Sequence, residues 1–131
     1  MNQITVETIE TAESWIELSN QKDIEGLSKL TDSKLELIGP KGIGVINHQE
    51  LGEWLERANL KLATTNQYAK DHFIVLEQDG TWLNDDDTIK GQAIVYTVFK
   101  VVNQKVIFLA RYDNKEEAFN ISGLSDEERI N

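Results

Sequence analysis

The second half of the chain contains β-rich segments that follow one another too closely for helices to connect them. Ile, Val, Phe, Tyr and Thr are concentrated in Phe73 to Leu76, Ile89 to Val102 and Lys105 to Tyr112, with turn-forming residues at 84–87 and 103–104. Strands that are separated by such short turns pair as antiparallel hairpins. This half therefore predicts an antiparallel meander.

The first half has helical periodicity. Ile9, Ala12 and Ile16 recur at helical spacing, and a second short helix is expected over Ile24 to Leu30, with Asp23 as its N-cap. A third helix is predicted from Asn47 to Asn59, because Asn47 and Glu50 form a capping box before an apolar stripe. That stripe consists of Leu51, Trp54, Leu55 and Ala58.

Shorter elements complete the prediction. Leu35 and Leu37 alternate with charged residues, which is typical of a strand that runs into Gly39. Near the end of the chain, Lys115 to Ile121 is expected to be a helix that ends at Gly123, and Ser125 with Glu128 forms a second capping box. Helices followed by a meander indicate an α+β fold, in which a curved antiparallel β-sheet wraps around N-terminal helices and leaves a cavity. With 131 residues, of which 40% are hydrophobic, we expect a single domain over 1–131.

Charge and composition argue against several classes of partner. The net charge of −10 repels polyanions, so neither nucleic acid nor an anionic membrane is an expected partner. The absence of cysteine suits a reducing cytoplasm, and we find neither a leader-like segment at Met1 to Glu10 nor an apolar span. We therefore expect a cytoplasmic protein without a membrane partner.

The glycines between 39 and 44 do not form a phosphate-binding loop. The pattern Gly42-x-Gly44-x-x-Asn47 lacks the third glycine of the dinucleotide fingerprint, and hairpins rather than a parallel strand follow it. We expect instead a turn around Pro40 and a hairpin that Gly42 and Gly44 permit.

Metal and cofactor sites are not expected either. His48 and His72 stand in no metal-binding spacing; we place His48 on the surface and His72 at a rim. The acidic run 84–87 lacks the glycine and the distant glutamate of a calcium loop, so a solvated hairpin tip is the better interpretation. No metal and no cofactor is predicted.

Charged residues within the last predicted strand indicate a site. Alternation places Ile107, Leu109, Arg111 and Asp113 on one face, and if that face is concave, Arg111 and Asp113 enter the cavity. Glu77 is the expected carboxylate partner of Arg111, as a charge-assisted pair or a structural salt bridge. A shift of register by one residue would turn Ala110 and Tyr112 inward instead. Trp15, Trp54 and Trp82 either line a pocket or belong to the core.

The order of these elements resembles the nuclear transport factor two-like superfamily, which includes ketosteroid isomerases and SnoaL-like polyketide cyclases. The resemblance spans Thr8 to about Gly123 and rests on "SWIELSNQKDIEGLSKLTDSKLELIGPKG", "HQELGEWLERANL" and "VYTVFKVVNQKVIFLARYDN". It implies a cone-shaped, cystatin-like α+β roll with a central pocket, and a homodimer that forms through the sheet. The isomerase pattern would place its catalytic groups at Trp15, Gly39 and Thr97, none of which matches the required residue type. Isomerase chemistry is therefore not expected.

The leading hypothesis is a domain that binds a small apolar or carboxylate- or carbonyl-bearing molecule. An alternative is a SnoaL-like enzyme (cyclase, isomerase or hydrolase type) with Asp113 or Glu77 as general base, and a second alternative is a protein-interaction module that acts through the sheet face. The predicted pocket residues are Trp15, Trp54, Leu76, Glu77, Thr97, Phe99, Leu109, Arg111 and Asp113.

Overall fold

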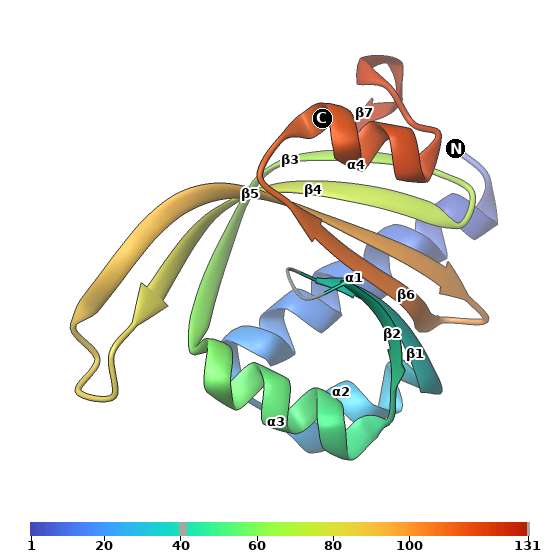
Figure 1. Ribbon diagram of the computed structural model, residues 1–131. Coiled ribbons are helices and arrows are strands. Elements are labelled where there is room, and N and C mark those ends of the chain that lie inside the picture. Colours follow the sequence, from blue (N-terminus) through green and yellow to red (C-terminus); the bar gives the residue numbers. More distant parts are fainter. Residues whose placement is uncertain (40–41, 131) are drawn as a thin grey trace.

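The computed structural model describes residues 1–39 and 42–130 (Figure 1). The helices within these ranges are α1 (Gln3–Gln21), α2 (Ile24–Lys29), α3 (His48–Ala58), α4 (Lys115–Ser122) and the short 3-10 helix η1 (Asp126–Glu128). The strands are β1 (Thr31–Gly39), β2 (Gly42–Ile46), β3 (Leu60–Lys70), β4 (Phe73–Leu83), β5 (Ile89–Val102), β6 (Lys105–Tyr112) and β7 (Arg129–Ile130).

The seven strands of the described ranges form one sheet in the order β2-β1-β6-β5-β4-β3-β7. The sheet curves strongly around α1, and the hairpin of β4 and β5 extends beyond the rest of the fold (Figure 1). The predicted α+β architecture, a curved sheet around N-terminal helices, is therefore confirmed. The sheet is mixed rather than purely antiparallel, because β1 pairs with β6 in parallel.

Local capping fixes the ends of the helices where the sequence predicts them. The Asn47 side chain accepts from the Glu50 backbone N–H, and the Glu50 carboxylate accepts from the Asn47 N–H, so the capping box of α3 is confirmed. Asp23 caps α2, and Gly123 ends α4 with a φ of 74°. The hairpin of β1 and β2 is also present, while the turn expected around Pro40 lies outside the described residues.

Removing the α3 cap is expected to cost stability without changing the fold. Asn47→Ala deletes the acceptor for the Glu50 N–H, and loss of such a cap costs about 1 kcal/mol. Urea denaturation of the variant and the wild type measures this loss. The loss of stability in Asn47→Ala is compared with that in Asn59→Ala at the C-terminal end of α3. Asn59 adopts a left-handed conformation there, and its side-chain amide donates to Leu83 O. An unchanged midpoint in Asn47→Ala would contradict the role of the cap.

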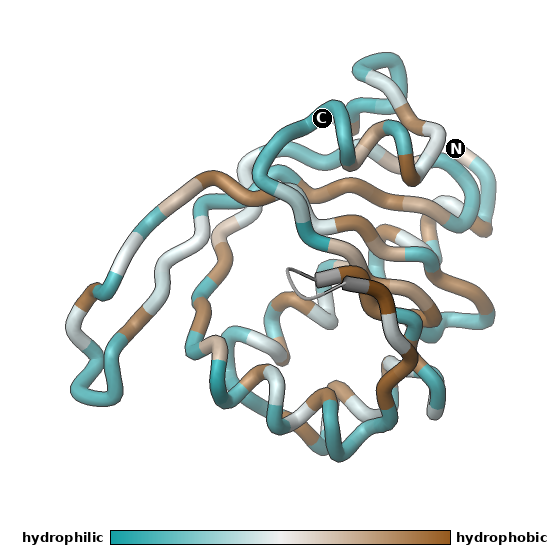
Figure 2. The backbone as a smooth tube through the Cα atoms, viewed as in Figure 1, coloured by the Kyte–Doolittle hydropathy of each residue, from teal (hydrophilic) through white to brown (hydrophobic). Residues whose placement is uncertain are grey.

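The described side chains form hydrophobic clusters on both faces of the sheet. The larger one fills the concave face against α1, where the Trp15 ring is fully buried and lies 5.1 Å from the Phe99 ring. The smaller one lies between the opposite, convex face and α4, and includes Val75, Val98 and Ala110. Hydrophobic residues follow the central strands, whereas the tip of the β4–β5 hairpin is hydrophilic (Figure 2).

A β-bulge in β6 changes which residues face the core. Lys100 pairs with Phe108 while the next residue, Val101, pairs with Val106, so Ile107 is left without a partner in β5. Val106, which precedes the bulge, and Leu109, which follows it, both face the concave cluster. The predicted face is therefore correct for Leu109 and Arg111 and wrong for Ile107, which packs against the convex cluster.

Candidate functional site

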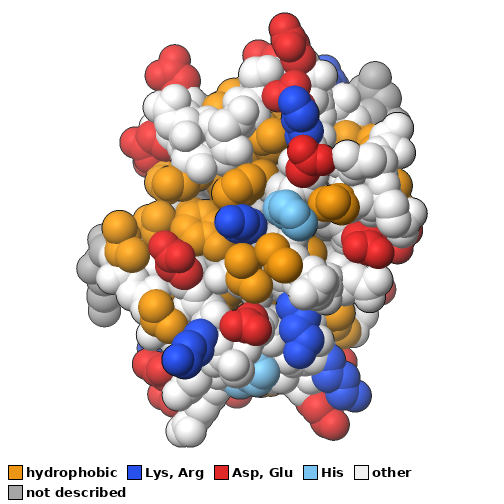
Figure 3. Space-filling model, turned by 90° about the vertical axis from the view of Figure 1, so that its right-hand side faces the viewer, with side chains coloured by type: hydrophobic (Ala, Val, Ile, Leu, Met, Phe, Trp, Pro, Cys, Tyr) orange, Lys and Arg blue, Asp and Glu red, His pale blue; other side chains and the backbone are white. Residues whose placement is uncertain are grey.

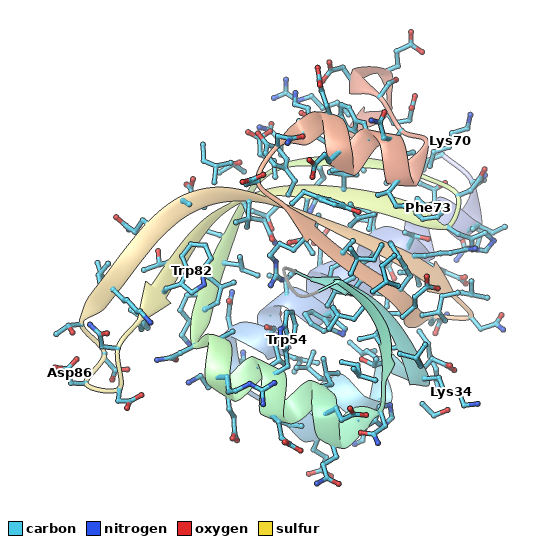
Figure 4. All side chains as sticks on the ribbon, in the orientation of Figure 1. Lys34, Trp54, Lys70, Phe73, Trp82 and Asp86 are labelled. Carbon is cyan, nitrogen blue, oxygen red and sulfur yellow. The ribbon has the colours of Figure 1, made fainter. Side chains whose placement is uncertain are left out.

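A cavity of about 610 Å³ opens on the concave side of the sheet, between the β4–β5 hairpin, α3 and the ends of β1 and β6. Trp54 rises from α3 and Trp82 lies on the hairpin arm, on opposite sides of this space (Figure 4). Most of the lining is apolar. The lining residues are Leu37, Ile38, Trp54, Ala58, Leu60, Trp82, Ala93, Ile94, Val95, Leu109, Arg111, Tyr112, Asp113 and Glu117.

Arg111 is the positively charged residue of this lining. Its Nε donates to Thr97 Oγ1 at 3.1 Å, and its guanidinium carbon lies 5.5 Å from the centre of the Trp54 ring, a distance typical of cation–π contacts. Burial lowers the pKa of Arg111 to about 10, because the cation loses hydration in this apolar surrounding. Arg111 therefore remains charged at neutral pH.

The expected pair between Arg111 and Glu77 does not form. Glu77 lies next to Leu76 on β4, and neighbouring residues of a strand point to opposite faces. Leu76 belongs to the concave cluster, so Glu77 lies on the convex side, where Asn66 Nδ2 donates to its carboxylate at 3.3 Å. In the described ranges, the ion pair within 4.0 Å is Lys115 with Asp126, and Arg111 has no carboxylate partner.

Acidic residues nevertheless lie near the cavity. Asp113 and Glu117 both contribute to its lining, and both side chains are exposed. Neither reaches Arg111 within the distance of an ion pair in the described part of the chain. Their place is at the solvent side of the cavity, whereas Arg111 is half-buried within it.

Buried polar side chains connect Arg111 to the interior of the sheet. Thr97 Oγ1 donates to Gln78 Oε1 at 2.7 Å, and Gln78 Nε2 donates to Thr64 Oγ1 at 3.1 Å. Thr97 and Gln78 are both 0% exposed. Sequence reasoning missed Gln78, although the alternation of β4 contains the signal: if Leu76 faces inward, so does Gln78.

The structure separates the predicted pocket residues into groups. Trp54, Leu109, Arg111 and Asp113 come together around the cavity. Trp15, Leu76, Thr97 and Phe99 are fully buried in the core behind it, and Thr97 reaches the site only through its bond to Arg111. Glu77 is on the other face of the sheet, as described above.

Two of the positions at which the resemblance would place isomerase groups, Trp15 and Thr97, bond to other side chains of the fold. Trp15 Nε1 donates to Thr31 Oγ1 at 3.0 Å, and the Thr31 hydroxyl donates in turn to Leu27 O at 2.7 Å. The Thr97 hydroxyl donates to Gln78 and accepts from Arg111. The third position, Gly39, is the last residue of β1. The indole N–H of Trp15 is thus directed at a core hydroxyl instead of at the cavity.

The histidines join elements of the fold. His48 Nε2 lies 2.9 Å from Thr31 O and 3.1 Å from Asp32 O, which ties the start of α3 to β1, and the side chain is half-buried rather than freely exposed. His72 Nδ1 lies 2.8 Å from Val101 O. Within residues 1–39 and 42–130, no group of three or more His, Asp or Glu side chains is arranged to hold a metal ion.

The exposed surface is mixed in charge. On the face shown in Figure 3, hydrophobic side chains gather near the middle around a basic side chain and a histidine, and acidic side chains are distributed around them. The tip of the β4–β5 hairpin is exposed, and there the Thr88 hydroxyl and N–H donate to Asp86 and lower the pKa of its carboxyl. None of the helices in the described ranges has the length and apolarity to cross a membrane.

Comparisons with solved structures give the fold a name. No protein-family model matches the sequence, and no curated protein does. A candidate SnoaL-like polyketide cyclase from Jannaschia sp. CCS1 superposes with a TM-score of 0.74 at 10% identity, covering 93% of this chain and 94% of that chain. An NTF2-like protein of unknown function from Cytophaga hutchinsonii ATCC 33406 gives a TM-score of 0.69 at 14% identity, covering 90% of this chain and 97% of that one.

A third structure, TerC co-crystallised with polyporic acid, has a TM-score of 0.70 at 15% identity and covers 88% of this chain and 97% of that chain. These identities are too low to transfer an activity, but nearly the whole described fold superposes in each case. What these similar structures share with this chain is the arrangement of N-terminal helices and a strongly curved sheet over most of its length. The chain therefore has the fold of the nuclear transport factor two-like (NTF2-like) superfamily.

Proposed function

We propose that the chain binds a small, flat, partly apolar molecule in the cavity, with Arg111 contacting a carboxylate or carbonyl group of that molecule. The observation on which the proposal depends is a half-buried guanidinium that has no carboxylate partner in the described ranges. Removing a cation from water is unfavourable unless a partner compensates it. A ligand that brings a negative charge or a strong acceptor would supply that partner.

The shape and lining of the cavity support this proposal. Ligand pockets typically enclose roughly 300 to 1,000 Å³ and combine apolar walls with a few polar groups, and the volume here, about 610 Å³, lies within this range. Trp54 and Trp82 provide flat aromatic surfaces on two sides. TerC, which has a similar fold, was co-crystallised with polyporic acid.

An enzymatic function is the second candidate. Asp113 lines the same cavity as Arg111 and is exposed, so it could exchange protons with solvent during a reaction. Glu77, the other residue proposed as a general base, faces the convex side of the sheet and is withdrawn from this role. In a carbonyl compound bound between the two residues, Arg111 would polarise the carbonyl group and Asp113 would act as the base.

A pair of fluorescent probes tests the binding proposal. Anilinonaphthalene sulfonate (ANS) and phenylnaphthylamine (NPN) share a flat aromatic body, but only ANS is an anion. We expect the wild type to bind both and to bind ANS more tightly. Arg111→Gln is expected to reduce the affinity for ANS by about tenfold or more, as for loss of a hydrogen bond to a charged group, and to leave NPN within about twofold. Fluorescence titration measures both affinities.

Arg57→Gln is the matched control, because it removes the same charge from an exposed position on α3. Its affinities for ANS and NPN should equal those of the wild type. If the wild type binds neither probe, the proposed binding function is contradicted. If Arg111→Gln and the wild type bind ANS equally, Arg111 is not the residue that contacts the ligand.

A further inference from the structure

The buried hydrogen-bond chain behind Arg111 has a fixed direction. The Nε of an arginine can only donate, so Thr97 Oγ1 accepts from it at 3.1 Å. The Thr97 hydroxyl must then use its own hydrogen to donate to Gln78 Oε1 at 2.7 Å. The Gln78 amide nitrogen is directed the other way and donates to Thr64 Oγ1 at 3.1 Å. Each donor in the row points away from Arg111.

The register of the sheet builds this row. Thr97 stands directly opposite Arg111 in the pairing of β5 with β6, and Gln78 stands opposite Thr64 in the pairing of β3 with β4. Gln78 lies diagonally opposite Thr97, because Leu76 is the direct partner of Thr97 and Gln78 follows two residues later on the same face of β4. The row thus crosses four strands and ends at an exposed threonine on β3.

The residue type at position 78 determines the charge of this row. A glutamate has nearly the same shape as Gln78 and could accept from Thr97 in the same way, but it would place a negative charge two hydrogen bonds from the guanidinium. With an amide there, the buried face of the sheet offers Arg111 orientation without neutralisation. Among the side chains of the described residues, Thr97 bonds to Nε of Arg111 and none bonds to the terminal guanidinium nitrogens, and Arg111 contributes to the lining of the cavity.

We propose that Gln78 is a positioning residue that, through Thr97, holds Arg111 as an uncompensated cation and commits the cavity to a flat apolar ligand with one negative charge. This inference rests on the proposed binding function and narrows it: of the carboxylate and carbonyl ligands left open above, it selects the anion. Asp113 and Glu117, the acidic residues of the lining, are exposed and do not pair with Arg111 within the described ranges, so they leave the positive charge available.

Gln78→Glu tests the inference with the same two probes. We expect the affinity for ANS to fall by about tenfold or more, because the new carboxylate neutralises the guanidinium and repels the sulfonate, while NPN stays within about twofold. Gln92→Glu is the matched control: it makes the same change of charge on β5, where Gln92 is exposed and does not line the cavity. Its ratio of ANS to NPN affinity should equal that of the wild type.

Thr97→Val is the second variant, and it decides the outcome if circular dichroism shows that Gln78→Glu does not fold. Valine has nearly the volume of threonine, so the change breaks the chain between Arg111 and Gln78 at constant charge. We expect a fall of about tenfold in ANS affinity with NPN within about twofold. A ratio of ANS to NPN affinity that is the same in the wild type and the folded variants would overturn the role of Gln78 but not the binding function. Failure of the wild type to bind either probe would instead overturn the binding function itself.

Discussion

Substituting methionine for Arg111 is expected to stabilise the unliganded protein by about 1 kcal/mol, which would raise its Tm by about 3 °C, while it removes the preference for an anionic probe. Most substitutions of half-buried residues destabilise a protein, so the sign of this effect is diagnostic. The expected gain arises because Arg111 is a desolvated cation without a carboxylate partner in the described ranges.

The direction of the pKa shift of Arg111 gives the sign of this change in stability. Burial lowers the pKa of Arg111 to about 10, well below the ordinary value of an arginine, so the folded state binds this proton less tightly than the unfolded chain does. The folded protein is therefore penalised at every pH below about 10, including neutral pH, and the penalty disappears only as the pH rises above the pKa of the unfolded chain. Methionine keeps an unbranched apolar side chain against Trp54 and removes the charge.

Thermal melts followed by circular dichroism at neutral pH measure the effect. Arg57→Met serves as the control, because Arg57 is exposed and its replacement should leave the Tm nearly unchanged. Residues that form binding sites are often held at a cost in stability, so a rise in Tm together with loss of ANS selectivity fits a site. A loss of about 2 kcal/mol or more would instead make Arg111 a structural residue of the core and would count against the proposed function.

Features that depend on neighbouring residues could be predicted from the sequence. The capping boxes at Asn47 and Ser125, the N-cap at Asp23 and the helix end at Gly123 each depend on a few consecutive residues, and all are present in the structure. Strands β5 and β6, which are rich in β-branched and aromatic residues, could also be predicted, because composition and alternation are local properties of the sequence.

Features that depend on distant partners could not be predicted in this way. Strand β3, with the sequence LKLATTNQYAK, has few β-branched residues and was not predicted; its place is set by pairing with β4. The parallel pairing of β1 with β6 leaves no local signal, since it joins segments about seventy residues apart. The bulge at Ile107 reverses the order of inward and outward residues within a single strand, which alternation alone cannot reveal.

The candidate site shows the same division. Arg111 and Leu109 were placed correctly on the concave face, since the bulge lies before them in β6. Leu76 and Glu77 were both proposed for the pocket, although consecutive residues of a regular strand cannot share one face. Applying alternation consistently would have replaced Glu77 by Gln78, the residue that the structure connects to Arg111 through Thr97.

Substitutions of Trp15 in the core and of Trp54 in the lining of the cavity are expected to separate stability from binding. Trp15 is 0% exposed, packs against Phe99 and donates to Thr31, so Trp15→Ala should cost about 3 to 5 kcal/mol. This is a large part of the stability of an ordinary domain. Trp54 is half-buried and lines the cavity, so Trp54→Ala should cost clearly less stability and weaken both ANS and NPN.

Urea denaturation measures the loss of stability in the two alanine variants, and probe titration measures the loss of binding. Because a strongly destabilised chain can bind ANS nonspecifically, Trp15→Phe is used for the titration; it keeps an aromatic ring and removes the N–H that donates to Thr31. We expect this variant to bind both probes as the wild type does, since Trp15 lies in the core behind the cavity and does not line it. If Trp15→Phe loses both probes and Trp54→Ala keeps them, the ligand binds among the core residues Trp15 and Phe99, and the cavity that Arg111 and Trp54 line is not the binding site.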